Sequence, residues 1–438
     1  MDKKYYILGG ILVLLLILAG VLFFTTSGPK PPSPSTDKLE LTWWKTFEDS
    51  ENVRELLTDY TATHKNVTVK FVKKEASTYE QELINALAAG AGPDIFSIHN
   101  DWLPKHADKI SPMPDQLMNL RTYKESFVDV ATTDFVKDDQ IYAIPIAMDV
   151  LALYYNKDLL GSSGISQPPA TWPELVSDAQ KITKVLKPGT FTRSGVALGT
   201  SNNVNRAVDI LTLLMLQNGT KFYSDDFGRA TFDQRQTIPG SNQNFDPGAI
   251  ALAFYTQFAD PAKVSYTWNV RSDLSVDAFT QGKLAMMLSF QYMQPVIQSK
   301  APNLNWDVAA VPQISEEVSK VNFANYWGES VSKLSKNSLA AWDFLNFISS
   351  KDELTKYYAK HKLVASRKDI IPSQVADTDL GVFAEGALTA RSVYKKDANL
   401  YEGVFVKMID DVILRNTDAE EALSNAAQQI NLDLQQRQ

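Results

Sequence analysis

The sequence predicts an α/β fold built on a parallel sheet, and three observations predict it. From residue 39 onward, apolar segments with a period of two residues alternate with amphipathic segments of helical period. Residues 39–98 follow the order β-α-β-α-β, which is typical of parallel strands joined by crossover helices. A length of 438 residues indicates two domains, since a domain usually holds about 100–200 residues.

The first block of elements contains three strands and two helices. The strands are expected at residues 39–44, 67–72 and 95–98, and the helices at residues 52–64 and 79–89. Gly90 ends the second helix, and the turn Gly92-Pro93-Asp94 leads into the third strand. Ligands of parallel sheets bind beyond the carboxyl ends of the strands, so the loops after Trp44 and Ile98 are candidate ligand positions.

A second block continues the same alternation. Strands are expected at residues 141–146, 150–155, 195–199, 284–288 and 306–311, and helices at residues 175–186, 204–216, 249–258, 337–349 and 418–434. Thr171 precedes Trp172-Pro173-Glu174 and is expected to cap the first of these helices. No period of 20–50 residues repeats, which argues against a solenoid or a propeller.

The N-terminus predicts a membrane anchor over residues 1–26. Residues 7–24 carry no charge and follow Lys3 and Lys4, and as a helix they cover roughly 27 Å. The alternative is a cleaved signal peptide, whose apolar region is usually shorter. The positive-inside rule places everything after Thr25 outside the cytoplasm. Residues 27–37, rich in proline and serine, are expected to form an extended linker.

Composition excludes several kinds of chemistry. The chain has no cysteine, so it has no disulfide, thiolate zinc site, iron–sulfur cluster or cysteine nucleophile. A net charge of −8 means that the chain has no overall excess of positive charge to attract nucleic acid, so no nucleic-acid partner is expected. A glycoside hydrolase is the alternative hypothesis, because Asp101 and Asp149 could form the pair of carboxylates that such an enzyme needs. Only four histidines and no serine-hydrolase, zinc-protease or P-loop motif favour a protein without catalysis, cofactor or metal.

Several segments occur in one order and spacing. They are Trp43-Trp44, residues 83–101, residues 144–160, residues 168–175, residues 277–286 and the Trp327-Gly328 turn. Together they make the chain similar to the extracellular solute-binding proteins of ABC importers, in the carbohydrate-binding class that includes the maltose-binding proteins. The resemblance covers nearly all of residues 39–434 and implies a periplasmic-binding-protein-like fold of two α/β lobes, joined by hinge crossings and preceded here by the N-terminal helix.

This resemblance implies how the chain is divided. The first lobe is expected at residues 38–146 plus 313–348 and the second at residues 150–309 plus 352–438. Crossings are expected near residues 143–150, 309–314 and 348–351. Closure of the lobes over the ligand is the expected switch. The partners implied are a carbohydrate, expected to be an oligosaccharide, and the permease subunits of an ABC importer. The chain itself is expected to be a monomer anchored in the cell membrane.

A sugar site needs flat aromatic rings beside groups that bond hydroxyls, and the family pattern selects candidates. They are Trp44, Lys45, Phe47, His99, Asn100, Asp101, Asp149, Asn202, Asn203, Phe290, Tyr292, Tyr326, Trp327, Gly328 and Glu329. Tyr292 with Phe290 is the favoured stacking pair.

Structural roles remain open for four groups of these candidates. Trp44 could pack in a second layer, the loop from His99 to Trp102 could cap a helix, Asp149 could form a buried ion pair, and Asn202-Asn203 could begin a helix. His99 and His106 lack a partner at metal-ligand spacing.

The nature of the ligand also stays open. The second-lobe loop with Asn202 and Asn203 is amidic where the best-known maltodextrin binder is acidic and aromatic, so the identity of the sugar does not carry over. Peptide, polyamine and polyol-phosphate ligands are the alternatives, as is a sensor or adhesin uncoupled from transport.

Overall fold

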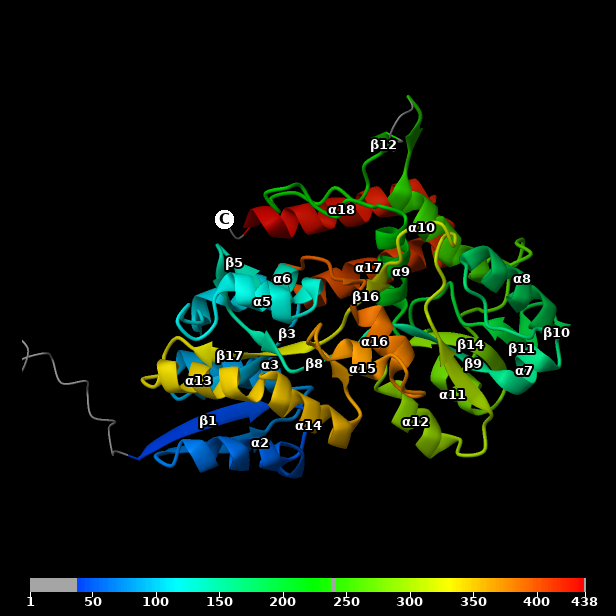
Figure 1. Cartoon of the computed structure of the whole chain (residues 1–438). Coiled ribbons are helices and arrows are strands. Elements are labelled where there is room, and N and C mark those ends of the chain that lie inside the picture. The colour runs from blue at the N-terminus through cyan, green and yellow to red at the C-terminus, as the bar shows by residue number, and fades with distance from the viewer. Residues whose placement is uncertain (1–37, 238–241, 437–438) are drawn as a thin grey trace, which may run out of the picture.

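The computed structural model describes residues 38–237 and 242–436 and consists of two α/β lobes side by side (Figure 1). This confirms the two-lobed α/β fold predicted from the sequence. The expected anchor at residues 1–26 and the linker at residues 27–37 lie outside the described residues. Within the described part of the chain, no helix combines the length and the apolar character that a bilayer crossing requires.

The first lobe is built on a mixed sheet. Its strands lie in the order β2 (Val67–Lys73), β1 (Leu39–Lys45), β3 (Ile95–His99), β17 (Trp327–Ser332) and β4 (Ile110–Ser111), and β7 (Ile144–Pro145) also pairs with β17. β1 runs parallel to both β2 and β3, as the β-α-β-α-β order predicted, whereas β17 returns antiparallel to β3. The sheet therefore carries the end of β1, the end of β3 and the start of β17 to one edge.

Helices cover this sheet and bury one face each. They are α2 (Ser50–Thr63), α3 (Tyr79–Ala88), α4 (Leu103–His106), α5 (Leu120–Ser126), α6 (Asp129–Phe135), α13 (Ser338–Ile348) and α14 (Lys351–His361). α2 begins with a reciprocal capping box between Asp49 and Asn52 and buries Val53, Leu56 and Tyr60. The chain turns after α3 at Gly90, whose φ of +68° suits glycine.

The second lobe is built on a five-stranded sheet. The strand order is β10 (Lys184–Lys187), β11 (Thr190–Val196), β14 (Leu284–Ser289), β9 (Ala152–Asn156) and β15 (Trp306–Ala309). Around it lie α7 (Lys157–Gly161), α8 (Trp172–Ile182), α9 (Ala207–Gln217), α10 (Pro247–Thr256), α11 (Ser275–Thr280), α12 (Met293–Lys300), α17 (Ala398–Arg415) and α18 (Ala419–Gln436). All six residues of β14 are buried, so this strand forms the centre of the core.

One expected helix ends early. Residues 175–186 were predicted to be helical, but α8 ends at Ile182 and residues 184–187 form β10. The Thr183 hydroxyl donates to the Ala179 carbonyl at 2.6 Å and accepts the Gly195 N–H at 3.0 Å, which fixes an extended backbone at this residue. The predicted capping role of Thr171 is confirmed, since Thr171 and Glu174 form a capping box.

The remaining elements are short and lie mainly at crossings and hairpins. They are η1 (Ala107–Lys109), β5 (Val136–Lys137), β6 (Gln140–Ile141), β8 (Ala147–Met148), β12 (Gln236–Thr237), β13 (Asn244–Phe245), η2 (Gln257–Ala259), β16 (Asn322–Phe323), β18 (Val364–Ala365), α15 (Ile371–Gln374), α16 (Gly381–Ala387) and β19 (Ala390–Arg391). β8 pairs with β18 and β16 pairs with β19, so two small ribbons connect the lobes.

Two contacts lie near the expected lobe boundaries. The Gln217 amide at the end of α9 donates to the carbonyls of Pro312 at 3.0 Å and Val321 at 3.1 Å. α14 packs on α2 of the first lobe, where Lys356 Nζ lies 2.9 Å from Asp59 Oδ2. The exact division of the chain between the lobes stays a prediction.

Candidate functional site

A cavity of about 660 Å³ lies between the lobes at the edge where β1 and β3 end. Its first-lobe lining comes from the loops after these strands and from the start of β17, and its second-lobe lining comes from α9, the end of β14 and the start of α17. A volume of this size suits a small organic ligand. We call it the main cavity.

Aromatic rings from both lobes line the main cavity. On the first lobe the ring centroid of Trp327 lies 5.8 Å from that of Phe47 and 5.2 Å from that of Trp102. Phe47 is 63% exposed, whereas phenylalanine side chains are usually buried in folded proteins. On the second lobe Tyr292 is 41% exposed and stacks on the buried Phe290. A ligand in this cavity therefore meets aromatic residues of both lobes.

A buried carboxylate supports the floor on the first-lobe side. Glu329 is fully buried and accepts hydrogen bonds from Trp43 Nε1 at 2.7 Å, from Lys45 Nζ at 2.6 Å and from the Ser97 hydroxyl. Burial acts to lower the pKa of Lys45, but the charges of Glu329 and Glu48 outweigh it and raise that pKa. Lys45 therefore lines the cavity as a fixed cation.

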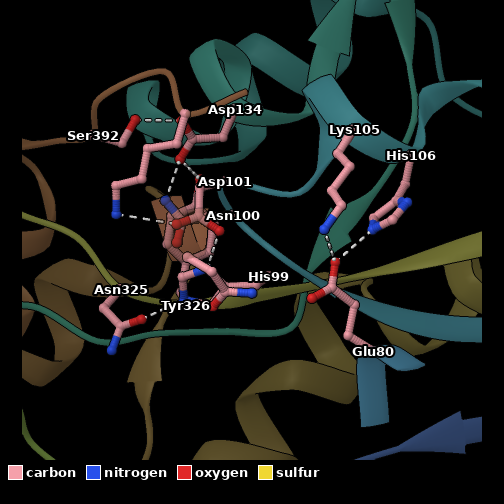
Figure 2. A network of polar contacts seen from close by, with 12 residues as sticks. Glu80, His99, Asn100, Asp101, Lys105, His106, Asp134, Asn325, Tyr326 and Ser392 are labelled. Atoms are coloured by element: carbon pink, nitrogen blue, oxygen red, sulfur yellow. Dashed lines mark hydrogen bonds and ion pairs between the residues drawn. The ribbon is translucent and has the colours of Figure 1, made fainter. Parts of the chain in front are cut away.

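An ion pair joins the two lobes beside the cavity. Asp101 Oδ1 lies 2.5 Å from His99 Nδ1, and Lys395, from the segment before α17, donates to Asp101 Oδ2 at 3.1 Å. Burial acts to raise the pKa of Asp101, but His99 and Lys395 hold it well below its usual range. His99 also lies 2.5 Å from Asn325 Oδ1 (Figure 2). We call Asp101 and Lys395 the interlobe ion pair.

Asp149 occupies the crossing between β8 and β9. Its carboxylate accepts the backbone N–H groups of Gln291 at 2.6 Å and Tyr292 at 3.3 Å, and it lines the main cavity. Burial raises the pKa of Asp149 to about 7, against the opposing effects of these hydrogen bonds and of Arg206. Near neutral pH this carboxyl can therefore either donate to or accept from a ligand hydroxyl.

Asp149→Asn is expected to change how stability depends on pH. The pKa of Asp149 rises from 3.8 to about 7 on folding, so its contribution to stability is lost as pH rises through this interval. The stability of the wild-type chain relative to Asp149→Asn should fall by at most about 1.4 kcal/mol per pH unit between pH 4 and 7. Urea unfolding of both proteins at each pH measures this difference. If the difference in free energy of unfolding between the two proteins stays constant with pH, the raised pKa of Asp149 is contradicted.

Eight of the fifteen candidates predicted from the sequence line the main cavity. They are Lys45, Phe47, His99, Asp101, Asp149, Tyr292, Tyr326 and Trp327. The structure brings them together because β1, β3 and β17 end at one edge and face Asp149 and Tyr292 across the crossing.

The other seven candidates lie away from its lining. Trp44 packs under Lys74, whose Nζ lies 3.8 Å from the ring centroid. Asn202 is exposed, and Asn203 is buried, where it donates to the carbonyls of Asn269 and Ser272. Phe290 lies behind Tyr292.

The remaining three of these seven belong to the first lobe, as Trp44 does. Gly328 has a packing role, because a Cβ there would lie 2.6 Å from Phe135. Glu329 lies two residues beyond Trp327 on the same face of β17, but it is fully buried, where it accepts from Lys45. Asn100 donates from Nδ2 to Asp134 Oδ2 at 3.1 Å (Figure 2) and is not part of the lining of the main cavity.

The main cavity is also lined by polar and aromatic residues that are not among the fifteen candidates. They include Trp102, Arg206, Asp209, Lys395 and Glu402. Asp209 carries a charge inside an otherwise apolar helix, where it pairs with Arg206, and this local anomaly could have indicated both. Lys395 and Glu402 carry no local signal, because only the return of the chain from β19 into α17 places them at the cavity.

Two α/β lobes that enclose a cavity lined by aromatic and hydrogen-bonding residues of both lobes define a protein that captures a solute between its lobes. The model of a known family, described as bacterial extracellular solute-binding protein, matches residues 44–354 of the chain. The chain belongs to this family. This confirms the resemblance drawn from the sequence.

Relatives extend this result. A putative binding protein of Brucella abortus is 28% identical over 309 residues, which are 68% of each chain. The galactooligosaccharide-binding protein of Bacillus subtilis is 22% identical over 355 residues, which are 80% of this chain and 78% of that protein.

Solved structures share the fold. A cyclo/maltodextrin-binding protein with bound maltotetraose gives a TM-score of 0.74 at 19% identity, covering 94% of this chain and 100% of its own. The sugar-binding protein MalE of Xanthomonas citri gives 0.73 at 20% identity, with 91% and 98% covered.

Proposed function

We propose that the chain binds an oligosaccharide in the main cavity and delivers it to the permease of an ABC importer. The observation that carries the proposal is the pair of aromatic surfaces, Phe47, Trp102 and Trp327 on the first lobe and Tyr292 on the second, beside hydrogen-bonding groups. A sugar ring presents C–H groups on its faces and hydroxyls at its edge, and this lining complements both. The names of the relatives and the ligands in the solved structures support the same class.

The space between the two lobes is long enough for a carbohydrate of more than one ring. A further cavity of about 430 Å³ shares Asp101, Trp102, Ala398 and Asn399 with the main cavity. It extends the space along the boundary between α3 and the start of α17, beyond what one ring requires. The continuous lining favours a chain of sugar rings over a monosaccharide.

Lobe closure is the proposed mechanism. The interlobe ion pair and the Asp134 contact with Ser392 both join one lobe to the other, so they form only when the lobes are together. A sugar that touches Trp327 and Tyr292 at once binds the closed arrangement better and shifts the population toward it. Permease subunits would then recognise the closed face, with the N-terminal helix holding the protein at the membrane.

Thermal unfolding in the presence of a ligand panel tests the proposal. The panel contains mono- and oligosaccharides, amino acids, short peptides and polyamines. Ligand at a hundred times its dissociation constant is expected to add about 2.7 kcal/mol to the free energy of unfolding. Stabilisation by oligosaccharides supports the proposal. Stabilisation by peptides or polyamines alone, or by no member of the panel, overturns the carbohydrate assignment.

A further inference from the structure

A second chamber of about 290 Å³ lies between the lobes and shares the interlobe ion pair with the main cavity. Asp101 and Lys395 line both spaces, so this pair separates them. The chamber takes its first-lobe wall from the segment after β3 and from α6, and its second-lobe wall from residues 216–227 and 392–395. Its volume equals that of roughly ten liquid waters, which is room for one sugar ring.

Aromatic rings form the second-lobe wall of this chamber. The ring centroids of Phe227 and Tyr394 lie 4.7 Å apart, and Tyr223 packs edge-on against Tyr394 at 5.4 Å. Phe227 is 50% exposed, although a phenylalanine side chain is apolar enough to be buried in a hydrophobic core. Exposed aromatic surface at the mouth of a pocket indicates a place where a ligand is bound.

Two residues that line the chamber each hold a buried polar atom without a hydrogen-bond partner. Among the described residues, six buried side-chain nitrogen or oxygen atoms have no partner, and two of them, Asn100 Oδ1 and Thr220 Oγ1, belong to residues of this lining. Asn100 and Thr220 are 5% and 7% exposed. A buried unpaired polar atom costs free energy unless something in the cavity bonds it. The two atoms lie on different lobes, so a molecule that bonds both joins the lobes.

The Asn100 side chain is held in place for such a role. Its Nδ2 donates to Asp134 Oδ2 at 3.1 Å, and the Tyr326 hydroxyl donates to the same carboxylate at 2.7 Å (Figure 2). These bonds fix the amide so that Oδ1 is left to accept from another group. A hydroxyl group is the donor that a carbohydrate offers in abundance.

We propose that this second chamber is an additional sugar subsite, which takes one ring of the oligosaccharide beyond the interlobe ion pair. The ring face lies on Phe227 and Tyr394, and its hydroxyls bond Asn100 Oδ1 and Thr220 Oγ1. Asp101 and Lys395 contact the rings on either side of the boundary. This inference rests on the proposed function, because its ligand is the same oligosaccharide.

A length series of oligosaccharides tests the inference by calorimetry. Wild-type affinity is expected to rise with chain length until the second chamber is filled. Phe227→Ala and Tyr394→Ala should each weaken binding of the longer oligomers by about tenfold, as expected for the loss of one aromatic contact, and leave mono- and disaccharides unchanged. Thr220→Val should weaken the same long oligomers without lowering the melting temperature. Phe191→Ala, a partly exposed aromatic residue of β11 that lines neither space, is the matched control.

Each of the other outcomes overturns either the subsite or the proposed function. If the wild type binds short sugars but gains nothing with length, or if both aromatic variants and Thr220→Val bind every length as the wild type does, the chamber holds only water. Equal losses for short and long sugars also overturn the subsite. If the wild type binds no saccharide of any length, the proposed function fails together with this inference.

Discussion

Glu329→Ala is expected to lower the free energy of unfolding of the chain by about 3–5 kcal/mol, the range found when one partner of a buried ion pair is removed. Glu329 is fully buried at the centre of the first-lobe sheet and accepts from Lys45, Trp43 and Ser97. Alanine leaves the Lys45 ammonium, itself 5% exposed, with a weaker partner, and leaves an indole N–H without an acceptor.

Urea unfolding measures this loss, and a double variant separates its causes. Lys45→Met combined with Glu329→Ala removes both charges, so it should be less destabilised than the sum of the two single variants. Glu329→Gln keeps the shape of the side chain and two hydrogen-bonding atoms and should lose less than alanine does. If Glu329→Ala lies within about 1 kcal/mol of the wild type, a typical value for an ordinary substitution, the buried charge is not important for stability.

Trp327→Ala is expected to weaken carbohydrate binding by about 1–3 kcal/mol, the range for a well-placed aromatic contact. Trp327 lies at the start of β17 and contacts Phe47, His99 and Trp102, so its removal opens the first-lobe wall of the main cavity. Tyr292→Ala removes the opposing ring and should cause a loss in the same range. Calorimetry with the sugar identified by the ligand panel measures both.

Trp44→Ala is the matched control for the aromatic wall. Trp44 lies at the same edge of the sheet but packs under Lys74, away from the lining of the main cavity. Its loss should leave affinity within about twofold of the wild type, a change of less than 0.5 kcal/mol. If Trp44→Ala weakens binding as much as Trp327→Ala, the effect comes from the strand ends and not from contact with the sugar. Unchanged affinity in both Trp327→Ala and Tyr292→Ala would overturn the site.

Much of the first lobe could be predicted from the sequence. The three strands at residues 39–44, 67–72 and 95–98 and the helices between them occur within a few residues of the predicted positions. Local periodicity is sufficient here, because each element buries one face and the order β-α-β-α-β makes β1, β2 and β3 parallel. The loops after β1 and β3, which the same logic selected as candidate ligand positions, line the main cavity.

It was harder to predict which single residues reach the cavity and which are buried in the sheet. Trp327 and Glu329 lie two residues apart in one short segment, and the family pattern selected both for the ligand. Only the packing of β17 between β3 and β4 decides that the first reaches the cavity and the second is sealed inside the sheet. A sequence period shows which residues share a face, but not how far along a strand the cavity begins.

By itself the sequence determined the α/β class, the family and the strand ends that carry the site, because these depend on periodicity and on motifs within short segments. The tertiary structure alone decided the interlobe ion pair and the second chamber. Asp101 and Lys395 are 294 positions apart, and they meet because the chain crosses between the lobes before entering α17. Such contacts result from the packing of whole lobes, and no local pattern of residues encodes them.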